Sequence, residues 1–147
     1  MRFAFTEEQR ELAAGVKEIL ARECTPARVR AAWEPGAPLA VWPHLAKAGV
    51  PLMTAPERAG GLGLGELEWV LVAEECGRFA LAEPLVEHVA VAVPALPPEL
   101  LRSVCVVALD AFVPQAVHAD LILVERNGGL VAVERRDDPF EPAAVER

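Results

Sequence analysis

The sequence has no long apolar run and no basic stripe, and these absences exclude whole classes of protein. None of its apolar runs approaches the roughly 20 residues needed to cross a bilayer, although 53% of the 147 residues are hydrophobic. A net charge of −8 would repel nucleic acid and anionic membranes. The N-terminus turns acidic and amphipathic at once, unlike a signal peptide. We therefore expect a cytoplasmic protein with neither nucleic acid nor membrane as a partner.

Side chains for disulfides, metals and nucleophilic catalysis are scarce. The single serine, Ser103, lies at the edge of an expected strand and not in a nucleophile elbow. The three cysteines lack CxxC spacing and predict buried, reduced thiols rather than a disulfide framework. The histidines have no ligand spacing, so we expect no metal site. These six residues are Cys24, Cys76, Cys105, His44, His88 and His118.

The first two thirds of the chain has the apolar periodicity of helices. Thr6 and Gln9 form the pattern of a capping box, in which each residue bonds the other's backbone N–H. Pro26 follows Thr25 and suits the first position of a second, short helix. Gly49 is typical of the residue that ends a helix. The pattern predicts helices at about 6–22, from 25 onward, and at 39–48, 65–79 and 84–93, with one further turn near 98–101.

Beyond Arg102 the pattern changes to short β-rich runs. They predict strands at 104–109, 121–124 and 130–133, and the Asn127-Gly128 pair predicts a tight hairpin before the last strand. The acidic, proline-broken stretch from Asp137 is expected to be frayed. The expected fold is α+β, with a bundle of about five helices in a domain spanning 1–95. A small antiparallel β segment would follow in 96–147.

The order of several motifs resembles the helical N-terminal domain of acyl-CoA dehydrogenases. That domain has a Trp-containing helix followed by Gly, a "P-E-x-x-G-G-L-G" loop and a helix with "E-E-x-G-R". Here Trp42 and Gly49 are followed by Pro56 to Gly63 and then by Glu74 to Arg78. The opening Phe5 to Arg10 is also similar to the start of that domain. The resemblance implies FAD as the family's cofactor and acyl-CoA thioesters as its substrates.

A shorter resemblance follows, in residues 112–124. Phe112 to Asp120 is similar to a "V-P-x-A-x-x-A-D" segment of the family's middle β-domain, which leads into a strand. Its first residues lie near the flavin in the family, and Phe112 and Pro114 are the positional equivalents. We do not expect either to be a ligand.

The chain also departs from the family in the parts that do the chemistry. A "T-E-x-x-x-G-S-D" stretch that grips flavin and thioester has no counterpart between Pro94 and Phe112. The C-terminal helical domain, which carries the catalytic glutamate and many FAD and tetramer contacts, has no counterpart either. We therefore assign no catalytic, cofactor-binding or metal residue, and expect that this chain alone binds no FAD.

Some remaining residues invite a functional interpretation, and each has a simpler structural one. Glu74 and Glu75 are candidate bases, but pairing with Arg78 one turn away explains them better. Asp137 and Asp138 fit a solvated tail. The glycines of 60–65 lack the spacing of a phosphate loop and fit a tight turn. Packing in the bundle is the simpler role for three tryptophans, Trp33, Trp42 and Trp69, although Trp42 could line an acyl-chain cavity.

These observations leave three hypotheses. The chain could be an acyl-CoA dehydrogenase-like protein, inactive alone, that needs a fuller partner chain and then acts on acyl-CoA. It could be a non-catalytic helical module for dimerisation, since truncation would leave apolar surface uncovered. It could also be a fragment of a longer enzyme.

Overall fold

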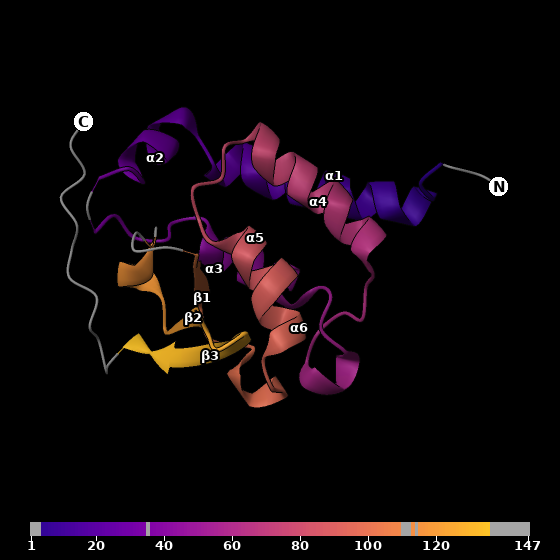
Figure 1. Cartoon of the computed structure of the whole chain (residues 1–147). Helices are drawn as coiled ribbons and strands as arrows, with labels where there is room; N and C mark the ends of the chain where they lie inside the picture. Colours follow the sequence, from indigo (N-terminus) through magenta and orange to yellow (C-terminus); the bar gives the residue numbers. More distant parts are fainter. Residues whose placement is uncertain (1–3, 35, 110–112, 114, 136–147) are drawn as a thin grey trace. The chain divides into compact units, whose positions relative to one another are not determined.

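The computed structural model describes residues 4–34, 36–109, 113 and 115–135 (Figure 1). The chain forms two compact units, Met1–Glu83 and Pro84–Arg147. Each unit has its own secondary structure and its own buried side chains, so the two are described separately. Within the described residues, no helix combines the length and the apolarity needed to span a membrane.

The first unit is helical. Its α-helices are α1 (Glu7–Glu23), α2 (Pro26–Ala31), α3 (Trp42–Lys47) and α4 (Glu66–Arg78), with 3₁₀ turns at Val50–Leu52 and Glu57–Ala59. Thr6 caps α1 through its side chain, which accepts from the N–H of Gln9, while the Gln9 amide oxygen accepts from the N–H of Thr6. The Thr25 hydroxyl likewise caps α2. The expected helix starts at Thr6 and Thr25 are thus confirmed.

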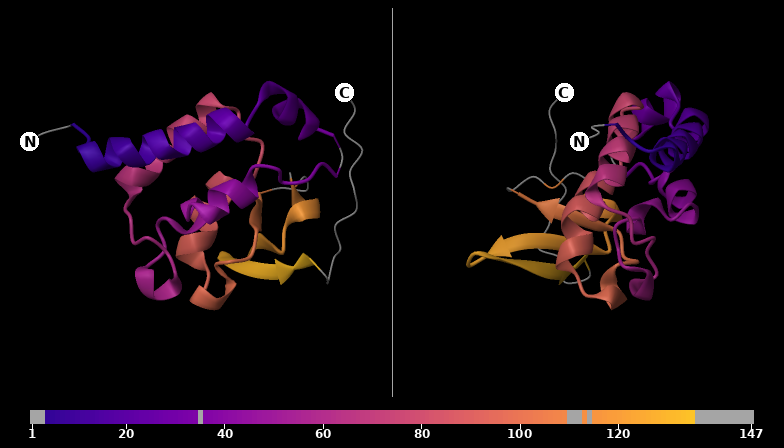
Figure 2. Two further views of the ribbon diagram at one scale, coloured as in Figure 1. Left: turned by 180° about the vertical axis from the view of Figure 1, so that it is seen from behind. Right: turned by 90° about the vertical axis from the view of Figure 1, so that its right-hand side faces the viewer.

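Helices α1 and α4 lie side by side and form the centre of this unit (Figure 2). The side chains of Val16 and Leu20 on α1 and of Val72 and Cys76 on α4 are buried. Full burial of one aliphatic side chain contributes about 1.5–3 kcal/mol. Burial of these four side chains therefore stabilises the pair, whereas Leu67 and Val70 on α4 are exposed.

The second unit opens with a continuous helical segment that changes its winding twice. It comprises α5 (Leu85–Glu87), a π-helical stretch at His88–Ala92 and α6 (Val93–Ala95). A 3₁₀ turn follows at Pro98–Leu100. The sequence predicted a helix and then a further turn here, as observed. It did not predict the π-helical stretch, because the apolar pattern of five residues is too short to distinguish a π-helix from an α-helix.

Three strands follow, β1 (Cys105–Ala108), β2 (Leu121–Arg126) and β3 (Gly129–Glu134), in the spatial order β1-β2-β3. Strands β2 and β3 form the expected antiparallel hairpin, visible as the orange and yellow pair in Figure 2. Asn127 and Gly128 adopt φ angles of 53° and 76°, as a tight hairpin turn requires.

Strand β1 departs from the expected antiparallel arrangement, because it pairs with β2 in parallel, with Cys105 opposite Leu121. Strand β2 therefore begins level with the start of β1, as a parallel pair requires. The junction is pinned by Asp120, whose carboxylate accepts from the N–H of Val104 at 2.7 Å while its own N–H donates to the Val104 carbonyl at 2.8 Å.

The sheet has a buried side and an exposed edge. Strands β1 and β2 bury side chains on both faces, in two clusters containing Ala92, Cys105, Leu121 and Leu123, and Val106, Ala119 and Ile122. In contrast, β3 is exposed except for the half-buried Val133. The continuous apolar runs of the first two strands reflect this burial on both faces.

One packing expectation is wrong. Trp33 follows α2 and is 77% exposed, so it does not pack in the bundle, whereas Trp42 and Trp69 are half-buried. The helix α2 has only six residues and buries no side chain, which leaves Trp33 without an apolar face to join. The stretch from Asp137 that was expected to be frayed lies outside the described residues.

Candidate functional site

The two residues that the resemblance places nearest a flavin, Phe112 and Pro114, lie outside the described residues, as do Asp137 and Asp138. The other carboxylates singled out from the sequence are on α4. Arg78 pairs with both, through its Nη2 to Glu74 and through its Nε to Glu75 at 3.3 Å. These contacts support the structural interpretation of the two glutamates as helix-surface partners of Arg78.

The glycine-rich loop has a structural reason for its composition. A Cβ on Gly61 would lie 2.1 Å from the carbonyl oxygen of Ala55, so no other residue fits there without displacing backbone. Gly60 and Gly63 have positive φ angles of 81° and 64°. The N–H of Gly63 donates to the Ala55 carbonyl at 2.9 Å. The loop therefore folds back on its own backbone, and the tight-turn interpretation is supported.

The sulfur and imidazole groups do not form a shared site. All three cysteines are buried free thiols, as expected. Burial raises the pKa of the Cys76 and Cys105 thiols to about 12. Among the described residues no cluster of three or more potential ligands could hold a metal ion. His88 is buried in the second unit, whereas His44 is exposed in the first.

A charged cluster lies where α1 ends. The buried Glu23 carboxylate accepts from Arg22 at 2.8 Å and from Arg28 at 2.5 Å, and His44 lies 3.5 Å away. The hydrogen bonds from Arg22 and then Arg28 lower the pKa of Glu23 below its usual value. The sequence gives no signal for this cluster, because its members come from three separate segments.

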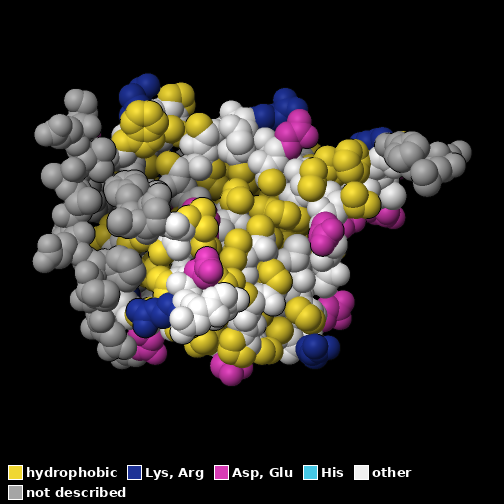
Figure 3. Space-filling model, in the orientation of Figure 1, with side chains coloured by type: hydrophobic (Ala, Val, Ile, Leu, Met, Phe, Trp, Pro, Cys, Tyr) yellow, Lys and Arg dark blue, Asp and Glu magenta, His cyan; other side chains and the backbone are white. Residues whose placement is uncertain are grey.

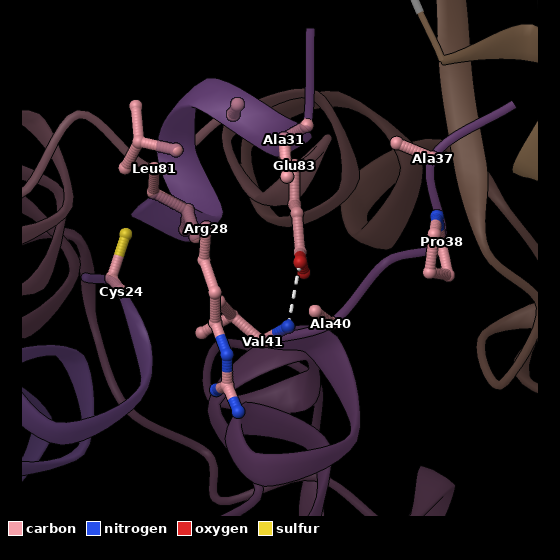
Figure 4. Close-up of a pocket in the computed structure, with 12 residues that line it drawn as sticks. Cys24, Arg28, Ala31, Ala37, Pro38, Ala40, Val41, Leu81 and Glu83 are labelled. Atoms are coloured by element: carbon pink, nitrogen blue, oxygen red, sulfur yellow. Dashed lines mark hydrogen bonds between the residues drawn. The ribbon is translucent and has the colours of Figure 1, made fainter. Parts of the chain in front are cut away.

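Beside this cluster lies a small apolar cavity, shown in Figure 4. Its volume is about 90 Å³, and it is formed by Cys24, Arg28, Val29, Ala31, Ala32, Ala37, Pro38, Ala40, Val41, Leu81, Ala82 and Glu83. Glu83 is the one carboxylate in this lining. Its Oε1 accepts from the N–H of Val41 at 2.6 Å (Figure 4). Burial raises the pKa of Glu83, although backbone hydrogen bonds from Val41 and Trp42 partly offset this.

Comparison with models of protein families identifies the family to which the helical unit belongs. The model of the acyl-CoA dehydrogenase N-terminal domain matches residues 6–96, more than half of the chain. The chain belongs to the acyl-CoA dehydrogenase family. The resemblance carried by the motifs from Phe5 to Pro84 is thereby confirmed, as is the α+β fold with its N-terminal helical domain. No curated protein matches the chain.

Solved structures support the same family. The crystal structure of the ChsE4–ChsE5 complex from Mycobacterium tuberculosis is similar, with 27% sequence identity and a TM-score of 0.76 over 95% of this chain and 50% of that one. A variant of the Tcur3481–Tcur3483 steroid ACAD shares the fold, with 24% identity and a TM-score of 0.69 over 88% of this chain and 48% of that one. This acyl-CoA dehydrogenase family member thus spans about half the length of the structures that it matches.

The family uses FAD, so the cavities of each unit can be tested for a fit. The cavity beside Glu83, at about 90 Å³, is well below the roughly 300–1,000 Å³ of typical ligand pockets. A larger, shallow hollow of about 610 Å³ in the second unit is lined by two carboxylates, Asp120 and Glu134, and one cation, Arg135. That charge balance opposes a pyrophosphate. Neither place fits FAD, and the expectation that this chain alone does not bind it stays a prediction.

Proposed function

We propose that this chain is a subunit of an acyl-CoA dehydrogenase that works only with a partner chain. The partner would supply the FAD site and the catalytic glutamate, and the complex would carry out α,β-dehydrogenation of acyl-CoA thioesters. The observation that carries the proposal is the family match over residues 6–96 in a chain that spans half the length of its structural relatives. By the resemblance, the parts needed for chemistry would lie in the half of those relatives that this chain does not match.

Two features support a partner chain as the missing element. One structural relative is a complex of two different chains, ChsE4 and ChsE5. In this chain, Leu67 and Val70 are 62% and 54% exposed one turn apart on α4. Figure 3 shows apolar side chains among the charged ones on the face that carries α4. Exposed apolar groups of this kind are typical of surfaces that bind another protein.

The subunit proposal also implies the domain boundaries of the chain and its location in the cell. Residues 1–95 would form the family's helical domain, and 96–147 a shortened remnant of its β-domain. We expect the complex in the cytoplasm, as a hetero-oligomer with a fuller acyl-CoA dehydrogenase chain. The FAD held by that chain would accept the hydride, because α,β-dehydrogenation removes a hydride from the β-carbon as well as a proton from the α-carbon.

Co-expression with a full-length acyl-CoA dehydrogenase tests the proposal. We expect the two chains to co-purify, and the complex to contain bound flavin and to reduce a dye when acyl-CoA is added. A steroid acyl-CoA, chosen because one structural relative is a steroid ACAD, and a straight-chain acyl-CoA would be compared as substrates. This chain alone should do neither. Stoichiometric FAD and acyl-CoA turnover by the isolated chain would refute the proposal.

The exposed pair on α4 also favours a second function, a non-catalytic module that dimerises or binds a related enzyme. Replacing Leu67 and Val70 with serine would then abolish self-association without altering the helical content. Sedimentation at micromolar concentration separates the two functions, because the subunit proposal needs no self-association. A wild-type chain that is strictly monomeric would exclude the homodimer.

A further inference from the structure

We propose that the cavity beside Glu83 binds a short primary alkylammonium ion, with the ammonium group at the Glu83 carboxylate and the carbon stem between the apolar walls. Every residue of this cavity belongs to the first unit. The inference is independent of the proposed catalytic partnership, because it concerns neither FAD nor acyl-CoA.

The size and lining of the cavity define the stem. A volume of about 90 Å³ is well below the roughly 300–1,000 Å³ of typical ligand pockets, so only a short stem fits. Its walls include the side chains of Val29, Ala32 and Leu81. A stem of about three carbons would fill this space, and each buried methylene contributes about 0.8 kcal/mol. A flavin, a fatty acyl chain or an aromatic ring with substituents is too large.

The Glu83 carboxylate defines the head group. Its Oε1 accepts from the N–H of Val41 at 2.6 Å. The backbone N–H of Trp42 also acts on this carboxylate, but the buried Oε2 has no hydrogen bond of good geometry among the described residues. A buried oxygen of a charged group is costly to leave without a donor. A primary ammonium carries three donors and a positive charge, so it would satisfy Oε2 with a charge-assisted hydrogen bond.

The neighbouring charges select a cation over an anion. Arg28 also lines the cavity, but its Nη1 donates to the Glu23 carboxylate at 2.5 Å and to the Glu23 carbonyl at 3.0 Å. Its guanidinium is therefore engaged with Glu23, a carboxylate that it shares with Arg22. Among the described residues, no lysine or arginine forms an ion pair with Glu83, although His44 is close enough to lower the pKa of this carboxyl. An alkyl carboxylate of the same length would meet a like charge at Glu83.

Titration of the full chain with n-propylammonium tests the site. We expect saturable shifts of the methyl NMR signals of Val29, Val41 and Leu81, without similar shifts elsewhere in the chain. n-Propanol and propanoate, which have the same stem without the positive charge, should bind at least tenfold more weakly. Absence of saturation, or equal binding of propanoate, would overturn the proposal.

Two variants and a control locate the binding. Glu83→Gln keeps an oxygen for the Val41 N–H, so the chain should fold while its affinity for n-propylammonium falls at least tenfold. Ala32→Leu should fill the cavity and abolish binding, whereas Ala46→Leu, at an exposed position of α3 outside the cavity, should bind as the wild type does. Thermal melts of each variant verify folding. Unchanged affinity in both cavity variants would contradict the assignment.

A lysine side chain ends in the same head group and stem. A further titration therefore distinguishes a free amine from a lysine of a polypeptide as the occupant. If Nα-acetyl-lysine methylamide produces the same shifts as n-propylammonium, the natural occupant is a lysine of a polypeptide. If n-propylammonium alone produces them, the occupant is a free amine. Either outcome presupposes binding at Glu83 and so supports the alkylammonium site.

Discussion

The amide nitrogen of Gln9 donates to Oε1 of Glu68 at 2.6 Å, across 59 residues of sequence. Both residues occupy the third position of their helix, α1 and α4. The Gln9 oxygen accepts from the N–H of Thr6, and the other Glu68 oxygen accepts from the N–H of Gly65 at 2.9 Å. One chain of hydrogen bonds therefore links the first turns of the two helices that form the centre of the first unit.

This link predicts that Gln9 contributes more than a local cap. Gln9→Ala removes the bonds to Thr6 and to Glu68, and should lower the free energy of unfolding by about 1 kcal/mol. Gln9→Glu keeps the acceptor for Thr6 but places a second carboxylate against Glu68, so it should cost at least as much. Urea denaturation measures both. A Gln9→Ala variant as stable as the wild type would mean that water replaces these bonds without loss.

The long-range half of the link shows where sequence reasoning ends. The capping box of Thr6 and Gln9 was predicted because both partners lie within one helical turn. The bond from Gln9 to Glu68 depends on how α1 and α4 pack, which no local pattern encodes. Gly65 has no side chain, so at α4 only the reciprocal half of a capping box exists, and the sequence pattern of a box is absent there.

The cavity was missed for the same reason. Glu83 precedes Pro84 in an irregular segment, and its backbone partner Val41 lies 42 residues earlier. From the sequence alone, a single carboxylate in a loop is expected to be exposed to solvent. The parallel pairing of β1 was missed because its apolar run suits either direction, and the decisive contacts, between Asp120 and Val104, join residues 16 positions apart in the sequence. The helices and the hairpin, in contrast, are specified by neighbours within a few residues.

The buried thiols give a prediction about reactivity. Because burial raises the pKa of Cys76 and Cys105 to about 12 and also raises that of Cys24, the thiolate fraction at neutral pH is very small. We expect a thiol reagent to modify none of the three cysteines quickly in the folded chain, and all three after unfolding in guanidinium. Rapid native labelling of one cysteine would show that its surroundings open to solvent.

His88 predicts a dependence of stability on pH. Burial lowers its pKa from 6.5 to about 4, although a hydrogen bond with the backbone of Leu101 opposes this. Between pH 6.5 and 4 the unfolded chain takes up a proton that the folded chain refuses, so stability is full above pH 6.5 and falls as the pH decreases to about 4. The separation of the two pKa values corresponds to about 3 kcal/mol.

Denaturation of the full chain at pH 7, 5.5 and 4 measures this contribution when His88→Leu is compared with the wild type. The variant should lose less stability on acidification, because it has no imidazole to protonate on unfolding. Carboxylates titrate in both proteins and cancel in the comparison. His118→Gln, at a half-buried position, should follow the wild type. Parallel curves for His88→Leu and the wild type would show that folding does not shift the pKa of His88.

Two glycine-to-alanine substitutions should have opposite effects. A Cβ at Gly61 would lie 2.1 Å from the Ala55 carbonyl oxygen. Because that oxygen is a backbone atom, the loop must move to make room for the Cβ. We expect Gly61→Ala to lower the free energy of unfolding by about 1–3 kcal/mol, the usual cost of overpacking. A Cβ at Gly77, within α4, would meet no atom within 4 Å. Gly77→Ala should therefore stabilise the chain by about 0.5–1 kcal/mol, because alanine restricts the unfolded state and favours the helix.

Thermal and urea denaturation of both variants provide the measurement, and each is the control for the other because the chemical change is identical. If Gly61→Ala is as stable as Gly77→Ala, the turn at Gly60 to Gly63 can relax without cost, and its glycines then need an explanation other than the close approach to Ala55. If Gly61→Ala alone is destabilised, steric closure of the loop accounts for its composition and no phosphate-binding role is needed.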